Sequence, residues 1–380
     1  MAYGSLGFTI VAAVAKILFM ILGFLMPLAS ILTWLERRQS AMMQDRLGPN
    51  RANIPLGFGK ETRLWAITHF MADAVKFLFK EDYVPGKAHK FLFMWAPIMA
   101  MAPALIVSAI IPFGPSLCWG HLFEKAAVCT QPVPLQIARL DVGLLFYFAI
   151  SSLAVYGATL AGWASHNKWA MMGGLRASSQ MMSYEVTMGM AILGSFLVYG
   201  TLEPGAIVSA QTSVIDTASY SHSWGLFTAP VGFILFLTAA IAETKRTPFD
   251  IPEGEPEIIG YFVEYSGLRF GMFFLGEFLE IVTSSAIMID LFFGGWHMGS
   301  WLDGLAVTHL PNILFVTTMA TAWLIKVFCF CSFQLLIRWS LPRFRSDQLM
   351  RLGWQRLLPV SIANVVCTAL IILAAQAFNW

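Results

Sequence analysis

The sequence predicts an all-α polytopic membrane protein with eight transmembrane helices and one amphipathic helix on the cytoplasmic side. Hydrophobic residues make up 57% of the 380-residue chain and charged residues only 12%, whereas an ordinary soluble domain carries about 25% charged residues. The mean hydropathy is +0.68. A soluble core could not hide this much apolar surface, so residues 1–380 are expected to form a single membrane domain.

Eight apolar runs are long enough to cross a bilayer, which takes about 17–25 residues in a helix. They lie at residues 7–35, 91–113, 140–164, 184–200, 226–243, 270–293, 311–337 and 357–378. The first run is too long for a secretory signal and lacks an A-x-A-like cleavage site, so we expect it to be retained.

The basic residues predict the orientation of the spans. Twenty of the 24 Lys and Arg residues fall in four alternate loops, at 36–90, 165–183, 244–269 and 338–356. Loops rich in Lys and Arg stay in the cytoplasm. The expected location is therefore a bacterial-type inner membrane, with both termini on the outer side.

The long first loop contains an amphipathic segment at residues 61–82. Its apolar residues recur at helical spacing, at Leu64, Ile67, Met71, Ala74 and Leu78, while Asp73 and Lys80 fall on the opposite side. This pattern predicts a helix lying at the cytoplasmic interface; an ordinary surface helix is the alternative.

Several ionisable residues lie inside predicted spans, where each costs roughly 2.5–3.5 kcal/mol at the bilayer centre. They are Glu185, Glu277, Glu280, Asp290 and Lys326. Glu277 and Glu280 are three residues apart and share one helix face. They indicate either structural ion pairs or a polar, proton-conducting interior.

Acidic residues also crowd the stretch "AETKRTPFDIPEGEPEIIGYFVEYSGLRF" at residues 242–270. The six acids are Glu243, Asp250, Glu253, Glu255, Glu257 and Glu264. A run of charge is usually a solvated loop, but here proline, isoleucine and aromatic residues separate the acids. We therefore expect a partly buried surface.

Cysteine spacing gives no sign of a metal site or an iron–sulfur cluster. Cys118 and Cys129 fall in an outward loop, where they form either a disulfide or two free thiols. No nucleotide-binding motif occurs, and the net charge of +2 gives no reason to expect a nucleic-acid partner. The chain is expected to carry no redox centre and no metal.

Several motifs together resemble one protein family nearly end to end. They include "QDRLGPNR" at 44–51, "GWASHNKWAMMGGLRASSQMMSYE" at 162–185, "RTPFDIPEGE" at 246–255 and "PRFRSDQLM" at 342–350. The chain resembles the H-subunit family of proton-translocating NADH:quinone oxidoreductase, respiratory complex I. It departs from the family pattern at Lys245 and Phe262, where Asn is expected, at Pro256, where Ser is expected, and at Glu280, an unexpected second acid.

The resemblance implies that the chain is a membrane subunit of this translocase, with NADH, FMN and iron–sulfur clusters in partner subunits. Its cytoplasmic loops would dock the peripheral-arm iron–sulfur and quinone-site subunits, and its spans would contact other membrane subunits and lipid. It would form the quinone tunnel and cavity wall, with quinone as substrate and with the following residues: Arg37, Arg46, Asp73, Lys76, Lys80, Glu243, Arg246, Asp250, Glu253, Glu255 and Glu257.

The same resemblance assigns two further roles. Proton coupling falls to Glu185, Glu264, Glu277 and Lys326, and structural or docking roles to Glu36, Arg176, Arg338, Arg343 and Asp347. Two alternatives are a homologous membrane subunit of an energy-converting hydrogenase or other-donor dehydrogenase, and a secondary transporter. Transporters commonly show paired repeats with interrupted helices, which this sequence does not display.

Overall fold

The computed structural model describes residues 6–50, 54–55, 61–62, 68–118, 132–211, 224–254, 257–299 and 310–377. Within these ranges, seven helices are long and apolar enough to cross a membrane. The predicted all-α membrane fold is confirmed, although the count of eight spans is approximate.

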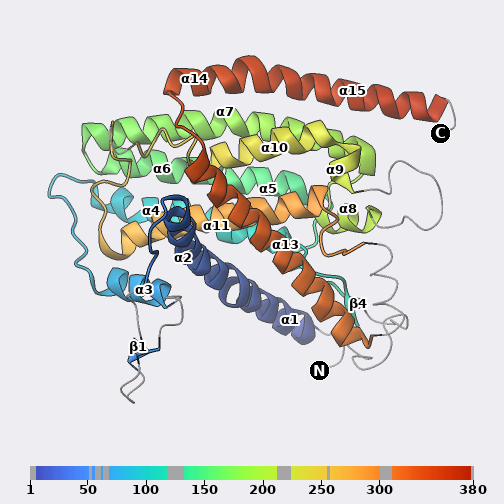
Figure 1. Cartoon of the computed structure of the whole chain (residues 1–380), viewed down its shortest axis with the longest axis horizontal. Coiled ribbons are helices and arrows are strands. Elements are labelled where there is room, and N and C mark those ends of the chain that lie inside the picture. The colour runs from blue at the N-terminus through green and yellow to red at the C-terminus, as the bar shows by residue number, and fades with distance from the viewer. Residues whose placement is uncertain are drawn as a thin grey trace.

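The first helices of the chain lie in the lower part of the view in Figure 1. Helix α1 (Leu6–Leu18) continues through a π-helical segment (Phe19–Leu25) into α2 (Met26–Met43). The amphipathic α3 (His69–Phe79) follows, and then α4 (Lys90–Val107), which ends in a 3₁₀ turn (Ser108–Ile110). Helices α5 (Gly143–Ser151) and α6 (Leu153–Ala164) together make the third long span.

The rest of the chain contributes α7 (Lys168–Tyr199), α8 (Pro204–Ala210), α9 (Gly225–Thr228), α10 (Pro230–Glu243) and α11 (Gly267–Phe292). Helix α13 (Asn312–Ser340) crosses the molecule diagonally, and α14 (Ser346–Arg351) runs through a π-helical segment (Leu352–Leu357) into α15 (Leu358–Ala377) along one edge (Figure 1). Two short antiparallel pairs join β1 (Ile54–Pro55) to β2 (Glu61–Thr62) and β3 (Leu117–Cys118) to β4 (Pro132–Val133).

The fifth predicted span, 226–243, is interrupted. Helix α9 ends before Ala229, whose backbone is not helical, and α10 begins at Pro230 with 14 residues. Proline lacks a backbone N–H and restricts the residue before it, which explains the break. At 1.5 Å per residue, α10 is about 21 Å long, shorter than a hydrocarbon core of about 30 Å.

Three other boundaries differ from the predicted ones. Helix α7 begins at Lys168, where the Asn167 side chain accepts a hydrogen bond from the Trp169 N–H, so most of the predicted loop 165–183 is helical. Similarly, α14 occupies part of the predicted loop 338–356. The amphipathic helix begins only at His69, and the apolar positions 64 and 67 lie outside the described residues. Hydropathy marks the apolar core of a helix, not its polar ends.

Helix α11 lies at the centre of the bundle, with most of its side chains buried, whereas those of α15 are mostly exposed. Helices α4 and α10 pack against α11, and α6 and α10 pack against α7. The buried acids of α11 are thus placed inside protein and not against lipid. Cys118 is disulfide-bonded; Cys129 lies outside the described residues, so the pairing of the two stays a prediction.

Candidate functional site

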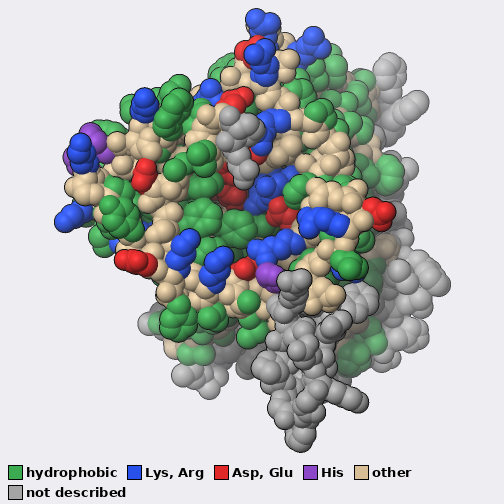
Figure 2. Space-filling model, turned by 60° about the vertical axis from the view of Figure 1, so that its left-hand side comes forward, with side chains coloured by type: hydrophobic (Ala, Val, Ile, Leu, Met, Phe, Trp, Pro, Cys, Tyr) green, Lys and Arg blue, Asp and Glu red, His purple; other side chains and the backbone are tan. Residues whose placement is uncertain are grey.

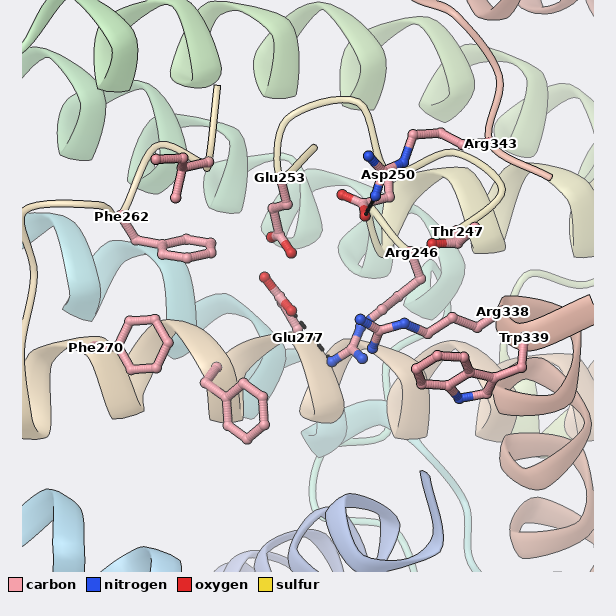
Figure 3. A pocket seen from close by; sticks show the side chains of 12 residues that line it. Arg246, Thr247, Asp250, Glu253, Phe262, Phe270, Glu277, Arg338, Trp339 and Arg343 are labelled. Atoms are coloured by element: carbon pink, nitrogen blue, oxygen red, sulfur yellow. Dashed lines mark hydrogen bonds and ion pairs between the residues drawn. The ribbon is translucent and has the colours of Figure 1, made fainter. Parts of the chain in front are cut away.

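A cavity of about 510 Å³ opens where the loop after α10 meets α11 and the end of α13 (Figure 3). Its lining combines charged and aromatic side chains: Arg246, Thr247, Asp250, Glu253, Ile259, Phe262, Phe270, Phe274, Glu277, Arg338, Trp339 and Arg343. We call it the charged cavity. Figure 2 shows the end of the molecule at the left of Figure 1, where Lys and Arg side chains gather around a hollow with hydrophobic side chains at its floor.

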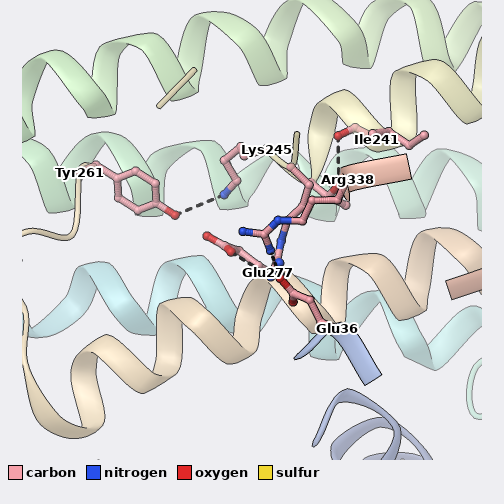
Figure 4. Close-up of polar contacts among 8 residues, drawn as sticks. Glu36, Ile241, Lys245, Tyr261, Glu277 and Arg338 are labelled. Atoms are coloured by element: carbon pink, nitrogen blue, oxygen red, sulfur yellow. Dashed lines mark hydrogen bonds and ion pairs between the residues drawn. The ribbon is translucent and has the colours of Figure 1, made fainter. Parts of the chain in front are cut away.

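An ion-pair network joins four distant segments at this cavity (Figure 4). Arg246 Nη1 donates to Glu36 Oε2 over 3.1 Å, and Arg246 Nη2 lies 3.3 Å from Glu277 Oε2. Arg338 from α13 donates to the other oxygen of Glu36. Arg246 and both its acidic partners are largely buried. Each acid is therefore paired with at least one arginine. Such pairing is needed because an unpaired charge is costly to bury.

A second set of contacts holds the loop between α10 and α11 in place. Arg343 Nη2 donates to Asp250 Oδ2 over 2.8 Å, and the Phe249 and Phe344 rings stack with centroids 5.6 Å apart. From α7, Gln180 Nε2 donates to the Phe249 carbonyl over 2.7 Å. Burial raises the pKa of Asp250, although Arg343 and Arg338 oppose the rise.

Glu253 and Glu277 point toward one another across the cavity (Figure 3). Burial, together with the facing Glu277 carboxylate, raises the pKa of Glu253 well above its ordinary value of 4.5. Glu253 Oε1 is buried and has no hydrogen-bond partner in the described part of the chain. Two carboxyl groups so close cannot both be charged at low cost, so the pair is suited to holding one proton.

A second cavity, of about 360 Å³, lies between α2, α3 and α11 and is mainly apolar; we call it the apolar cavity. Its lining is Met26, Ser30, Thr33, Phe70, Asp73, Ala74, Phe77, Leu78, Met101, Leu268, Gly271, Met272, Phe274 and Leu275. Phe274 lines both cavities. The two spaces are therefore neighbours across one aromatic ring.

A polar cluster joins α2 to α3 beside the apolar cavity. Arg37 lies 2.7 Å from Asp73 Oδ2 and 2.8 Å from His69 Nδ1. Since arginine can only donate, His69 Nδ1 is the acceptor. The sequence predicted Arg37 and Asp73 here but missed His69, whose signal is its position four residues before Asp73 on the same helix.

Other predicted residues are absent from the linings of both cavities. Lys76, Lys80, Arg46 and Asp347 are exposed, and Arg46 donates to Gln44. Glu255 lies outside the described residues. The predicted residues that do meet at the charged cavity are Arg246, Asp250, Glu253, Glu277, Arg338 and Arg343.

The remaining acids each have a different setting. Glu257 pairs with Arg176 at the surface over 2.9 Å, and Glu264 accepts from Asn167 over 2.7 Å. Glu185 is partly buried on α7. Glu243 is buried and lines a separate space of about 20 Å³ with Glu280, instead of the charged cavity.

Lys326 donates to three backbone carbonyls just after α11, those of Phe293, Gly295 and His297, over 2.8, 3.0 and 2.6 Å. An ammonium group at a helix C-terminus is favoured by the helix dipole. Sequence reasoning missed three aromatic lining residues, Phe270 and Phe274 on α11 and Trp339 at the end of α13. The signal for the first two is their spacing of four residues, which places them on one face of a helix; Trp339 has no comparable signal. No cluster of three metal-binding side chains occurs in the ranges that the structure describes.

The helices and the charged cavity define a multi-pass membrane protein with a polar interior. The family model described as NADH dehydrogenase matches residues 15–369. The chain is 40% identical over 366 residues to the H subunit of NADH-quinone oxidoreductase from Bdellovibrio bacteriovorus, covering 91% of this chain and 92% of that one. It is also 40% identical over 363 residues to the corresponding H subunit from Syntrophotalea carbinolica, covering 95% and 96%.

A third relative is NADH-quinone oxidoreductase subunit 8 of Rhodothermus marinus, 39% identical over 361 residues, covering 94% of this chain and 96% of that one. The chain therefore belongs to the H-subunit family of NADH-quinone oxidoreductase. The resemblance seen in the sequence motifs is confirmed.

Proposed function

We propose that the chain forms the membrane end of a quinone tunnel in NADH:quinone oxidoreductase and couples quinone reduction to proton translocation. The observation that carries the proposal is the junction at Phe274 between an apolar and a charged cavity. Cavities of roughly 300–1,000 Å³ are the size that small ligands occupy. The apolar cavity suits the hydrophobic tail of a quinone and the charged cavity its polar headgroup.

The position of α3 supports access from the membrane. This amphipathic helix carries Phe70, Phe77 and Leu78 on the face that lines the apolar cavity, while Lys76 and Lys80 are exposed. Such a helix lies in the interfacial plane of a bilayer. A quinone dissolved in lipid would pass between α2, α3 and α11 to reach Phe274.

The carboxylates give a physical route from redox chemistry to proton movement. A unit charge placed 10 Å from a carboxylate changes its energy by about 1.7 kcal/mol at an effective dielectric near 20, slightly more than one pKa unit. Electrons entering a quinone near Glu253 and Glu277 would favour proton uptake by that pair. Because interacting carboxyls titrate together, the change would spread to Glu243 and Glu185.

The complex would supply what this chain lacks. NADH, FMN and the iron–sulfur clusters would belong to partner subunits, and the cytoplasmic loops would dock the peripheral-arm subunits that close the cavity from above. Other membrane subunits and lipid would cover the apolar faces of helices such as α15. The expected setting is a bacterial-type inner membrane with both termini outside.

The junction can be tested in the purified, assembled complex. Phe274→Trp, which enlarges the ring shared by the two cavities, should lower NADH-driven reduction of a long-chain quinone at least fivefold. NADH oxidation by a soluble acceptor that needs no cavity should stay unchanged. Leu370→Trp, on the exposed face of α15, is the matched control. Normal long-chain quinone turnover in assembled Phe274→Trp would overturn the proposal.

A further inference from the structure

Helix α3 is a lightly embedded wall of the apolar cavity. All 11 of its residues are at least partly exposed, although Phe70, Phe77 and Leu78 line the cavity. Toward its C-terminal end, the Phe77 ring packs against the rings of Phe270 and Phe274, with centroids 6.0 and 6.4 Å apart. Burial of apolar surface is what usually holds a helix in place. Because α3 buries little of it, the polar contacts of this helix have a large influence on its position.

The N-terminal end of α3 is fastened to α2 through the guanidinium group of Arg37. Arg37 Nη1 lies 2.8 Å from His69 Nδ1, and Arg37 Nη2 lies 2.7 Å from Asp73 Oδ2. His69 and Asp73 are about one helical turn apart, so the planar guanidinium bridges two successive turns of α3. His69 Nδ1 is 3.7 Å from the same oxygen of Asp73, which is too long for a hydrogen bond. The histidine therefore binds the arginine and not the carboxylate.

This arrangement requires a neutral His69 ring. Arginine can only donate, so Nδ1 must offer its lone pair to Arg37. A proton bound at Nδ1 would turn this acceptor into a donor and would place two positively charged groups 2.8 Å apart. The protonated ring would instead turn toward Asp73 and compete with Arg37 for that carboxylate. Histidine side chains change charge between about pH 5 and pH 8, so the fastening of α3 is sensitive to pH.

The other charged groups on the helices that pack against α3 do not take part in this contact. On α2, Glu36 is bound by Arg246 and Arg338. On α11, Glu277 pairs with Arg246, and Arg269 pairs with Asp82. Within the described ranges, no ion pair or hydrogen bond joins His69 to the remaining titratable groups of α2, α3 and α11, which are Arg38, Lys76, Glu280 and Asp290. Arg37 and Asp73 are therefore the groups that respond directly to the charge of His69.

We propose that His69 is a positioning residue for quinone entry: the neutral ring holds Arg37 and keeps α3 seated over the apolar cavity, and the protonated ring loosens α3 from α2. Phe70 follows His69 directly and lines the cavity, so a movement of this end of α3 changes the cavity wall. The proposal rests on the proposed function, because it adds an acid-sensitive entrance to the same tunnel. Proton binding to the imidazole ring needs no oxidant or reductant.

The test measures KM and kcat of the purified, assembled complex for a long-chain quinone between about pH 5.5 and pH 8, where a histidine changes charge. In wild type, KM should rise about threefold toward the acid end, as expected for loss of a partly exposed contact. His69→Gln offers Arg37 a carbonyl acceptor that binds no proton, so its KM should stay at the alkaline wild-type value. His69→Leu offers no acceptor, so its KM should be raised at every pH.

The matched control is His89→Gln, which changes an exposed histidine just before α4 and should keep the wild-type profile. A second readout, independent of quinone, is amide hydrogen exchange in α3. At the acid end, exchange in residues 69–79 should be several-fold faster in wild type than in His69→Gln, and at the alkaline end the two should agree. Comparing the two proteins at the same pH removes the chemical effect of pH on exchange.

Two results would overturn the role of His69. One is a KM that depends on pH equally in wild type and His69→Gln, or that stays level or falls toward the acid end in wild type. The other is equal exchange in α3 at the acid end. If His69→Leu fails to assemble, the comparison of wild type with His69→Gln decides.

Failure of this inference is distinguishable from failure of the proposed function. If Phe274→Trp lowers long-chain quinone reduction while wild type and His69→Gln have the same profile, only the role of His69 is wrong. If Phe274→Trp has no effect, the quinone assignment is wrong, and the role of His69 in quinone entry fails with it, even where exchange in α3 still depends on His69.

Discussion

The Arg246 guanidinium lies 3.3 Å from the Glu277 carboxylate, so a loop residue at the charged cavity is paired with an acid inside α11. Both side chains are almost completely buried. This ion pair joins the wall of the cavity to the interior of the membrane bundle. A change of charge in the cavity therefore changes the electrostatic energy of Glu277 inside the bundle.

Replacing Arg246 should disrupt the protein strongly. Arg246→Met leaves Glu36 and Glu277 buried with less positive charge, and removing one member of a buried ion pair costs about 3–5 kcal/mol. We expect loss of the assembled complex, measured by native electrophoresis of detergent extracts. Arg246→Lys should rescue only partly, since one ammonium cannot reproduce the planar contacts to both acids.

The control for this prediction is Arg356→Met, which changes an exposed arginine and should assemble normally. Normal assembly and quinone reduction in Arg246→Met would show that the ion pair does not support the cavity.

Glu253→Gln should make the protein more stable at alkaline pH. The folded-state pKa of Glu253 is raised above 4.5 by burial and by Glu277, so the neutral form is favoured. The stability from this group is present below pH 4.5 and is lost as the pH rises through the raised pKa. Glutamine cannot ionise, so the variant should melt at a higher temperature than wild type on the alkaline side.

The measurement is the melting temperature of the complex as the pH is raised from the ordinary carboxyl pKa into the alkaline range, through the raised pKa of Glu253. Glu257→Gln is the matched control, because Glu257 is 60% exposed and its replacement should have little effect. Identical pH dependence in wild type and Glu253→Gln would contradict the raised pKa.

Arg343→Ala should loosen the loop after α13. The substitution removes the 2.8 Å hydrogen bond to Asp250 and leaves a mostly buried acid without that partner, at a cost of about 1–3 kcal/mol. Protease cleavage between residues 341 and 345 should become several-fold faster. Asp250→Asn in the same background should slow cleavage again; equal cleavage in wild type and Arg343→Ala would exclude a bracing role.

Asp73→Asn should weaken quinone access more than stability. The Arg37–Asp73 pair is partly exposed, and such pairs contribute about 0–1 kcal/mol. Because it fixes α3 beside the apolar cavity, we expect the KM for a long-chain quinone to rise about threefold with kcat nearly unchanged. Glu81→Gln, which changes an exposed acid just after α3, is the control, and an unchanged KM in Asp73→Asn would rule out this role.

Hydropathy predicted the helical spans well, because the thickness of the bilayer sets the length of apolar sequence that a spanning helix needs. It could not predict that α7 starts at Lys168 or that Pro230 breaks the fifth span, since these depend on caps and backbone chemistry. The motifs correctly predicted that Arg246, Asp250 and Glu253 belong to one site, because the three residues lie in the same loop. The facing of Glu253 and Glu277 depends on how the loop after α10 folds over α11, and the meeting of Glu243 and Glu280 at one small space depends on how α10 and α11 are rotated. Only packing determines both.

If acids of the charged cavity couple quinone reduction to proton translocation, as we propose, removing one of them should impair that coupling. The measurement compares assembled wild type and Glu253→Gln at neutral pH for NADH-driven quinone reduction and for protons moved per NADH oxidised. We expect the variant to lose at least half of one or both, with assembly intact. An assembled variant with wild-type rate and wild-type proton ratio would contradict it.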